Sequence, residues 1–185
     1  MCVYFLYIEM INIYCGIIWD TFINMLKDFF HKYVENTREK AIITDERMFL
    51  CMLTVAVCRG LNILYRNVYI TSRAIKHMYD KKPAEEFSFI INHLYEIIRY
   101  PDKIYKNKSG KRGELSFVKK IGNSDYFVSI EHKTNIEPEE IEVATAFRLR
   151  DKRYIEKYTL LWDWGNGNPH RSAFDAPKES TNAPQ

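Results

Sequence analysis

The chain has 185 residues, of which 46% are hydrophobic and 15% are aromatic, and its formal net charge is +3. This composition supplies enough apolar material for a folded core and excludes a chain that is disordered throughout. Because the net charge is small, a polyanionic partner would have to be bound by a local concentration of lysine and arginine.

The first segment, MCVYFLYIEMINIYCGIIWDTF, is strongly apolar, but Glu9, Asn12 and Asp20 interrupt it. It lacks the basic start and the cleavage site of a signal peptide, and Glu9 is unfavourable in a membrane-spanning helix. Three interpretations stay open: an additional core helix, a weak membrane anchor, or sequence upstream of a true start, which would leave residues 1–24 outside the protein. We expect a cytoplasmic protein without stable membrane association.

Two further segments are interpreted as helices of an N-terminal helical region that spans residues 1–61. Residues 22–40 carry apolar side chains at helical spacing. The segment TDERMFLCMLTVAVCRG is interpreted as one buried helix, with Thr44 or Asp45 as its cap and Gly60 as its stop. All four cysteines (Cys2, Cys15, Cys51 and Cys58) lie in this region without metal-ligand spacing, so we expect buried free thiols.

The next part of the chain predicts a strand and two helices. A short β-branched strand at residues 68–71 leads into a helix that carries His77, with Thr71 and Ser72 at its start. Pro83 is suited to open a second helix, which has an apolar stripe from Phe87 to Ile98, and Pro101 ends it.

Beyond a basic loop, the period of the pattern changes from helical to alternating. ELSFVKKI, DYFVSIEHK and IEVATAFRL predict three successive antiparallel strands, with GNSD as a hairpin turn. Residues 151–158 predict a short helix. The expected fold class is α+β, with two helices packed on a small antiparallel sheet in residues 62–164, preceded by N-terminal helices and followed by a disordered tail at 165–185.

Strand alternation selects candidate site residues. Lys119 shares a face with Leu115 and Phe117, whereas Lys120 lies on the other face. By the same rule Val143, Thr145 and Phe147 share one face, which places a hydroxyl among apolar neighbours; His132 is a second candidate imidazole beside His77. Each of these residues also has a purely structural interpretation.

A set of basic and aromatic residues surrounds these candidates. The stretch from Lys103 to Lys120 carries seven lysines and arginines with Glu114 as its acidic residue. Candidate phosphate- or RNA-binding residues are Arg73, Tyr105, Lys106, Lys108, Lys111, Arg112 and Arg148. Familiar metal-binding and nucleotide-binding motifs are absent from the sequence, so we expect no metal site and no cofactor.

The combination of an imidazole, a lysine, a hydroxyl and a basic loop is suited to RNA cleavage. RNA supplies its own nucleophile, the ribose 2′-OH, so the protein needs a proton acceptor, a proton donor and cations for the charged transition state. Tyrosines such as Tyr105 could stack on unpaired bases.

Residues from about 62 to 160 resemble the phage and mobile-element nucleases of the barnase–EndoU–colicin–RelE fold group. The resemblance rests on VYITSRAIKHMY, LYEIIRYPDKIYKN, GELSFVKKI, YFVSIEH and IEVATAFRLRDKRYIEKY, in that order. It implies a small toxin-like or host-takeover ribonuclease acting on tRNA or mRNA, with an inhibitor or antitoxin protein as partner. It also implies His77 as general acid/base, Lys119 or Lys120 with Arg148 or Arg112 on the phosphate, and Thr145 orienting it.

One alternative of another class stays open: a non-catalytic module on the same fold that binds RNA or another protein. Turnover of RNA distinguishes the two, because a binding module would show salt-dependent binding without cleavage.

Overall fold

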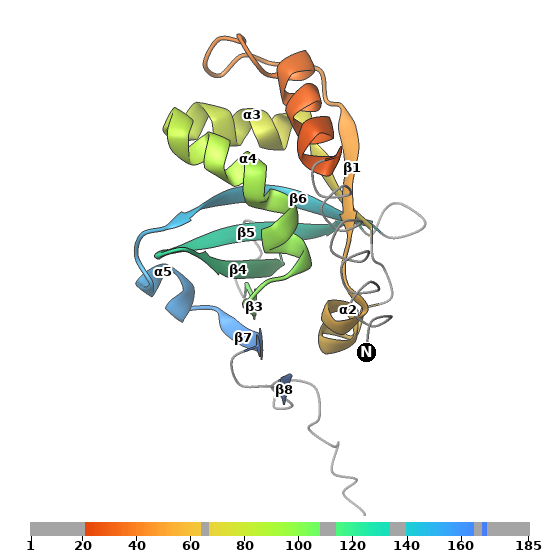
Figure 1. Ribbon diagram of the computed structural model, residues 1–185, viewed down its shortest axis with the longest axis vertical. Coiled ribbons are helices and arrows are strands. Elements are labelled where there is room, and N and C mark those ends of the chain that lie inside the picture. The colour runs from red at the N-terminus through yellow and green to blue at the C-terminus, as the bar shows by residue number, and fades with distance from the viewer. Residues whose placement is uncertain (1–20, 64–66, 108–113, 134–139, 165–167, 170–185) are drawn as a thin grey trace, which may run out of the picture.

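The computed structural model describes residues 21–63, 67–107, 114–133, 140–164 and 168–169 (Figure 1). The described strands form one sheet in the order β1-β2-β6-β5-β4-β3-β7-β8. Their bounds are β1 Arg47–Met52, β2 Asn67–Thr71, β3 Lys103–Lys106, β4 Leu115–Ile121, β5 Ser124–Lys133, β6 Glu140–Leu149, β7 Thr159–Asp163 and β8 Asn168–Pro169. All neighbouring strands are antiparallel except β2 and β6, which are parallel.

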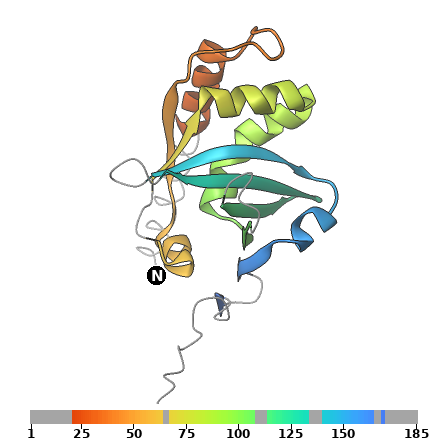
Figure 2. The same ribbon diagram turned by 180° about the vertical axis from the view of Figure 1, so that it is seen from behind.

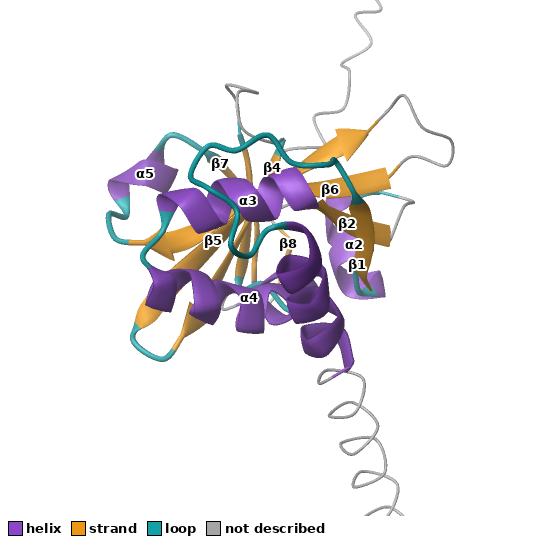
Figure 3. Cartoon of the chain, turned by 90° about the horizontal axis from the view of Figure 1, so that it is seen from above, coloured by secondary structure: helices purple, strands orange, loops and turns teal. Residues whose placement is uncertain are grey.

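Two helices cover one face of this sheet, as the sequence predicts. They are α3 (Ser72–Lys81) and α4 (Ala84–Arg99), which lie above the strands in Figure 1 and in front of them in Figure 3. The apolar stripe of α4 is buried against Phe117, Val128 and Ala146 of the sheet. We call this side the α4 face. The α+β prediction is therefore confirmed.

A short helix, α5 (Arg153–Glu156), lies on the opposite side of the sheet, below the strands in Figure 2. Phe127 and Leu149 belong to a second apolar cluster on this side, and Tyr154 and Ile155 of α5 pack against it. We call this side the α5 face. Its apolar cluster is smaller than the core under α4.

The prediction of one helix over residues 44–60 is wrong. Residues 47–52 form β1, an edge strand paired with β2, and only Val55–Leu61 are helical, as α2. Thr54 caps α2, and Asn62 ends it in the left-handed conformation with φ 52°. An unbroken apolar run has no period, so it fits a strand that is buried on both sides as well as a buried helix. Of the helix predicted over residues 22–40, residues up to 33 are helical, whereas residues 34–40 form turns and a loop.

Besides β1, the strands β3, β7 and β8 were not expected from the pattern. The start of the predicted basic loop is β3, which pairs with β4 and β7, and β7 itself follows α5. The GNSD turn is confirmed, with Gly122 at φ 59° between β4 and β5. Of the predicted disordered tail, only Asn168–Pro169 lie within the described residues.

The start of the first core helix and both ends of the second also follow the sequence. Thr71 accepts a hydrogen bond from the Ala74 amide at 3.2 Å, and Pro83 stands immediately before α4. α4 ends at Arg99, two residues before Pro101. Within the described part of the chain, no helix has the length and apolar character needed to cross a membrane.

Candidate active site

The α5 face carries a row of hydroxyl groups across three neighbouring strands. Ser116 of β4 pairs with Ser129 of β5, and Ser129 pairs with Thr145 of β6. Both serines are fully buried, Thr145 is half-buried, and the Ser116 hydroxyl has no hydrogen-bond partner among the described residues.

A β-bulge determines which residues of β6 join this row. The register shifts between Ser129 and Ile130, so Val143 pairs with Ile130 on the α4 face, whereas Thr145 pairs with Ser129 on the α5 face. The prediction that Val143 shares a face with Thr145 and Phe147 is therefore wrong, because the bulge inserts one extra residue between them. Thr145 and Phe147 do share a face.

His77 lies on the exposed side of α3. The buried side of this helix includes Ile75 and Met78, while Tyr79 packs against rings of the N-terminal helix and α4. His77 therefore shares a row with Arg73 and Lys81, four residues before and after it. Arg73 forms an ion pair with Asp45 at 3.3 Å.

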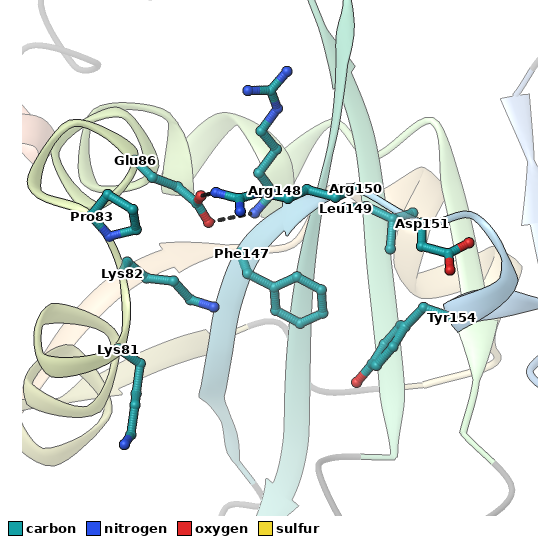
Figure 4. A pocket seen from close by; sticks show the side chains of 10 residues that line it. All are labelled: Lys81, Lys82, Pro83, Glu86, Phe147, Arg148, Leu149, Arg150, Asp151 and Tyr154. Carbon is teal, nitrogen blue, oxygen red and sulfur yellow. Dashed lines mark hydrogen bonds and ion pairs between the residues drawn. The ribbon is translucent and has the colours of Figure 1, made fainter.

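Lys81, the last residue of the row with Arg73 and His77, also lines a pocket at the end of β6. We call this pocket the Phe147 pocket; its volume is about 300 Å³. Its lining, drawn in Figure 4, comes from the connection between α3 and α4, the end of β6, and α5. The residues are Lys81, Lys82, Pro83, Glu86, Phe147, Arg148, Leu149, Arg150, Asp151 and Tyr154.

Aromatic rings position one cation of the Phe147 pocket. The Phe147 ring stacks on Phe127 at 4.7 Å and meets Tyr154 edge-on at 5.3 Å. The Lys82 ammonium lies 4.9 Å from the Phe147 ring centroid, within cation–π range. Figure 4 shows Lys81, Lys82, Phe147 and Tyr154 extending to one side of the β6 ribbon, and the Arg148 side chain to the other.

The carboxylates of the Phe147 pocket are already engaged by other groups. Glu86 accepts hydrogen bonds from the Arg150 guanidinium at 2.7 Å and from the Arg148 amide at 3.2 Å. Arg153 donates to Asp151, which lowers the pKa of that carboxyl. Among the described residues, no carboxylate lies within ion-pair distance of Lys81, Lys82 or the Arg148 guanidinium, so the pocket can accept an anion.

A second pocket adjoins the first on the far side of the same strand end. It has a volume of about 500 Å³ and we call it the hairpin pocket, since the β4–β5 turn forms one wall. Its lining residues are Lys120, Asn123, Ser124, Asp125, Arg148, Leu149, Arg150 and Lys152. Arg148, Leu149 and Arg150 line both pockets.

The two candidate lysines of β4 have different environments. Lys119 is on the α4 face with a side chain that is 15% exposed, and its ammonium donates to the Tyr100 carbonyl at 2.8 Å. Glu96 and Asp102 lie 3.6 and 3.7 Å from the same ammonium. Lys119 thus ties β4 to the end of α4, on the face away from Thr145.

Lys120 is exposed and lies on the α5 face. Lys120 pairs with Asp125 of β5 and lies four residues beyond Ser116 in β4. Thr145, in contrast, is level with Ser116, because both pair with Ser129. Four residues of strand correspond to roughly 13 Å. The structure therefore brings Lys120 together with Arg148 in the hairpin pocket and leaves both separate from Thr145.

The basic loop lies only partly within the described residues. Tyr105 is buried on the α5 face, and burial raises the pKa of its hydroxyl. Lys106 is exposed and lies 3.8 Å from Glu114. Lys108, Lys111 and Arg112 fall outside the described residues, as does the side chain of His132. Their predicted roles stay predictions.

Two of the four cysteines can be placed. Cys51 and Cys58 are buried thiols, as expected, and burial raises the pKa of Cys51 to about 12. Cys2 and Cys15 lie outside the described residues. Within the described part of the chain, no group of three or more histidine, cysteine, aspartate or glutamate side chains is arranged to hold a metal ion.

Several residues of the two pockets were not candidates from the sequence. Lys81, Lys82, Arg150 and Lys152 stand at element ends, where lysine and arginine are common in solvated positions. Tyr154 lies in the segment 151–158 that is predicted as a short helix, and nothing in that pattern marks it as a site residue. The signal that could have found them is the repeated basic pattern of RLRDKR directly after the strand with Thr145.

Comparison with known proteins gives one match. Residues 54–156, more than half of the chain, match the model of the family described as phage-Barnase-EndoU-ColicinE5/D-RelE like nuclease 3. Neither the curated proteins nor the solved structures include a significant match to the chain. The matched range includes the helices α2 to α5 and the strands β2 to β6. It also includes His77 and all residues that line the two pockets. The chain therefore belongs to this family of nucleases related to barnase, EndoU, colicins E5 and D, and RelE.

Proposed function

We propose that the protein is an endoribonuclease that cleaves RNA at the Phe147 pocket and the adjoining α5 face. The observation that carries the proposal is the position of His77. It lies one helical turn from Lys81, which lines a pocket with cations that have no described carboxylate partner. An imidazole next to an anion site is the arrangement that phosphodiester cleavage requires.

The reaction follows from the chemistry of RNA. The 2′-oxygen attacks phosphorus while the bond from phosphorus to the 5′-oxygen breaks, which leaves a 2′,3′-cyclic phosphate and a 5′-hydroxyl. The proton of the 2′-OH must be accepted, and a proton must be given to the leaving oxygen. We assign His77 to one of these transfers. Lys81 and Lys82 would stabilise the extra negative charge on the phosphate oxygens. Arg148, whose side chain extends to the other side of β6, stays a candidate for phosphate binding in the hairpin pocket.

The structure supports different roles for the other candidates. Lys119 is held by Tyr100, Glu96 and Asp102, so we assign it to stabilising the connection after α4 rather than to catalysis. Lys120 stays a candidate for phosphate binding in the hairpin pocket. Thr145 stays a candidate for orienting the substrate on the α5 face. A tRNA or mRNA substrate, and an inhibitor protein as partner, stay predictions.

Cleavage of RNA in the presence of EDTA tests the proposal. A single-stranded RNA oligonucleotide should yield 2′,3′-cyclic phosphate ends, and the all-DNA oligonucleotide of the same sequence should stay intact. A positioned acid or base typically contributes about 100- to 10,000-fold, so His77→Ala should lower kcat by at least about 100-fold.

His31→Ala is the matched control, because His31 is an exposed helix histidine that pairs with Glu35 at 2.7 Å, away from both pockets. It should cleave at the wild-type rate. Cleavage by His77→Ala at more than a tenth of the wild-type rate would remove His77 from the site. Salt-dependent RNA binding with no turnover at any pH would instead favour the non-catalytic module.

A further inference from the structure

The two pockets form one continuous surface around the end of β6. Arg148, Leu149 and Arg150 belong to both linings, so an occupant of one pocket lies against an occupant of the other. The Phe147 pocket is bounded by aromatic rings, whereas the hairpin pocket is lined mainly by charged and polar groups.

The hairpin pocket has an excess of positive charge. Lys120, Arg148, Arg150 and Lys152 line it, and Asp125 is the only carboxylate in its lining. Asp125 lies 4.0 Å from the Lys152 ammonium, at the limit of an ion pair, and Lys152 is highly exposed. Such a pair contributes little, so Lys152 is available to another anion.

The lining of the hairpin pocket favours a phosphate backbone over a protein partner. It contains no aromatic residue, and Leu149 is its one large apolar residue. Protein-binding surfaces obtain most of their affinity from buried aromatic and arginine anchors, whereas grooves for single-stranded nucleic acid use cations that follow the backbone.

From these observations we propose that single-stranded RNA occupies both pockets at once. The phosphate that is cleaved lies in the Phe147 pocket, and a neighbouring phosphate of the same strand lies in the hairpin pocket between Lys120 and Lys152. This inference rests on the proposed function, because it takes RNA as the substrate. It adds that the RNA strand must continue past the cleaved phosphate in order to occupy the hairpin pocket as well.

Binding of RNA that cannot be cleaved tests the inference without requiring turnover. The probes are a 2′-O-methyl dinucleotide and a 2′-O-methyl hexanucleotide, and the quantity measured is the dissociation constant as a function of salt. The slope of log K against log salt falls by about 0.7 for each phosphate contact that is lost from a single strand. Lys120→Ala and Lys152→Ala should each lower the slope for the hexanucleotide by about this amount, and leave the slope for the dinucleotide unchanged.

Two further variants sharpen the result. Lys157→Ala removes a cation immediately after α5 that lines neither pocket, so its slopes should equal those of the wild type. Asp125→Asn removes the competing carboxylate and should tighten hexanucleotide binding by about two- to fivefold, the range expected for an exposed charge pair.

The outcomes separate the inference from the proposed function. A hexanucleotide slope that is unchanged by both lysine substitutions overturns the two-pocket arrangement, whether or not RNA is cleaved. Altered slopes without RNA cleavage would support the arrangement and overturn the catalytic proposal.

Discussion

The buried ion pair between Lys76 and Asp80 shows how single residues stabilise the position of α3. Both side chains are less than a tenth exposed. The Lys76 ammonium also donates to the Arg38 carbonyl at 2.8 Å, and Asp80 accepts from the Lys40 amide at 3.0 Å. The pair therefore holds the connection before β1 against the helix that carries His77.

We predict that Asp80→Asn strongly destabilises the fold. Removal of one partner leaves a buried charge uncompensated, which costs about 3–5 kcal/mol of the free energy of unfolding. Urea denaturation at pH 7 would measure this loss. Glu35→Gln, in the exposed pair with His31, is the control and should change stability by less than about 1 kcal/mol. An equal effect of the two substitutions would contradict the prediction.

The pH dependence of this effect follows from the pKa of Asp80. Burial acts to raise the pKa, but the hydrogen bonds from Lys76 and the Lys40 amide outweigh it and lower the pKa below its usual value. The unfolded chain therefore binds the proton more readily than the folded protein. The stabilisation by the Asp80 carboxylate is present above about pH 4 and is lost as the pH falls through the folded pKa. The stability difference between wild type and Asp80→Asn should shrink accordingly as the pH falls below about 4.

At the scale of one element, the bulge in β6 determines which side chains face the site. Ala144 is the extra residue between Val143 and Thr145. Because of it, apolar Val143 lies on the α4 face and polar Thr145 on the α5 face. Ala146 lies beyond the bulge, is fully buried on the α4 face, and pairs with Val128.

Deletion of single residues on either side of Thr145 should therefore give opposite results. Removal of Ala144 restores a regular strand in which Val143 and Thr145 keep their faces. Removal of Ala146 forces Phe147 toward α4, into a position that holds an alanine, which costs stability by overpacking. Thermal unfolding should show a cooperative transition for the first variant and a transition lowered by at least about 8 °C, or lost, for the second. Equal stability of both variants would show that the bulge does not set the faces.

On the scale of the whole molecule, the core extends beyond the range that matches the family. The matched residues 54–156 bury their apolar side chains together with residues on both sides of that range. These outside residues are Leu26, Phe30, Val34, Leu50, Cys51, Leu53, Leu161 and Trp162. β1 and β7 also pair directly with strands inside the matched range.

A fragment of residues 54–156 should for this reason fail to fold alone. Each large buried apolar side chain contributes about 1.5–3 kcal/mol, and the sum over these residues other than Cys51, roughly 10–20 kcal/mol, is at least as large as the net stability of about 5–15 kcal/mol of a typical domain. Circular dichroism should show no cooperative unfolding for this fragment, whereas residues 21–164 should unfold cooperatively. A stable 54–156 fragment would show that the flanking elements are dispensable.

The sequence predicts those parts of the fold that have a clear period. α4 is amphipathic over its whole length, and β4 and β5 alternate, so their faces and their turn could be predicted. β1 could not, since Phe49 to Leu53 form an apolar run without a period. The bulge at Ala144 also leaves no periodic signal, and that is why the face of Val143 was predicted incorrectly.

The candidate site could be predicted only in its local parts. The helix with His77 and the strand with Thr145 follow from their own residues, and Lys119 and Lys120 could be told apart as belonging to opposite faces. The pockets could not be predicted. They depend on the approach of the α3–α4 connection, including Lys82, to Phe147 of β6, which is a contact between distant parts of the chain.

The parallel pairing of β2 with β6 has a consequence for the time at which the enzyme acquires its site. During synthesis, β2 leaves the ribosome early. Its parallel partner β6 follows only after α3, α4 and the three strands β3 to β5. Pairing over such a separation is slow because a long loop must close first. Arg148, Arg150 and Tyr154 are made later still. While residues 78–154 are being made, the nascent chain therefore carries His77 without the complete Phe147 pocket, and the candidate site can form only once Tyr154 has been made.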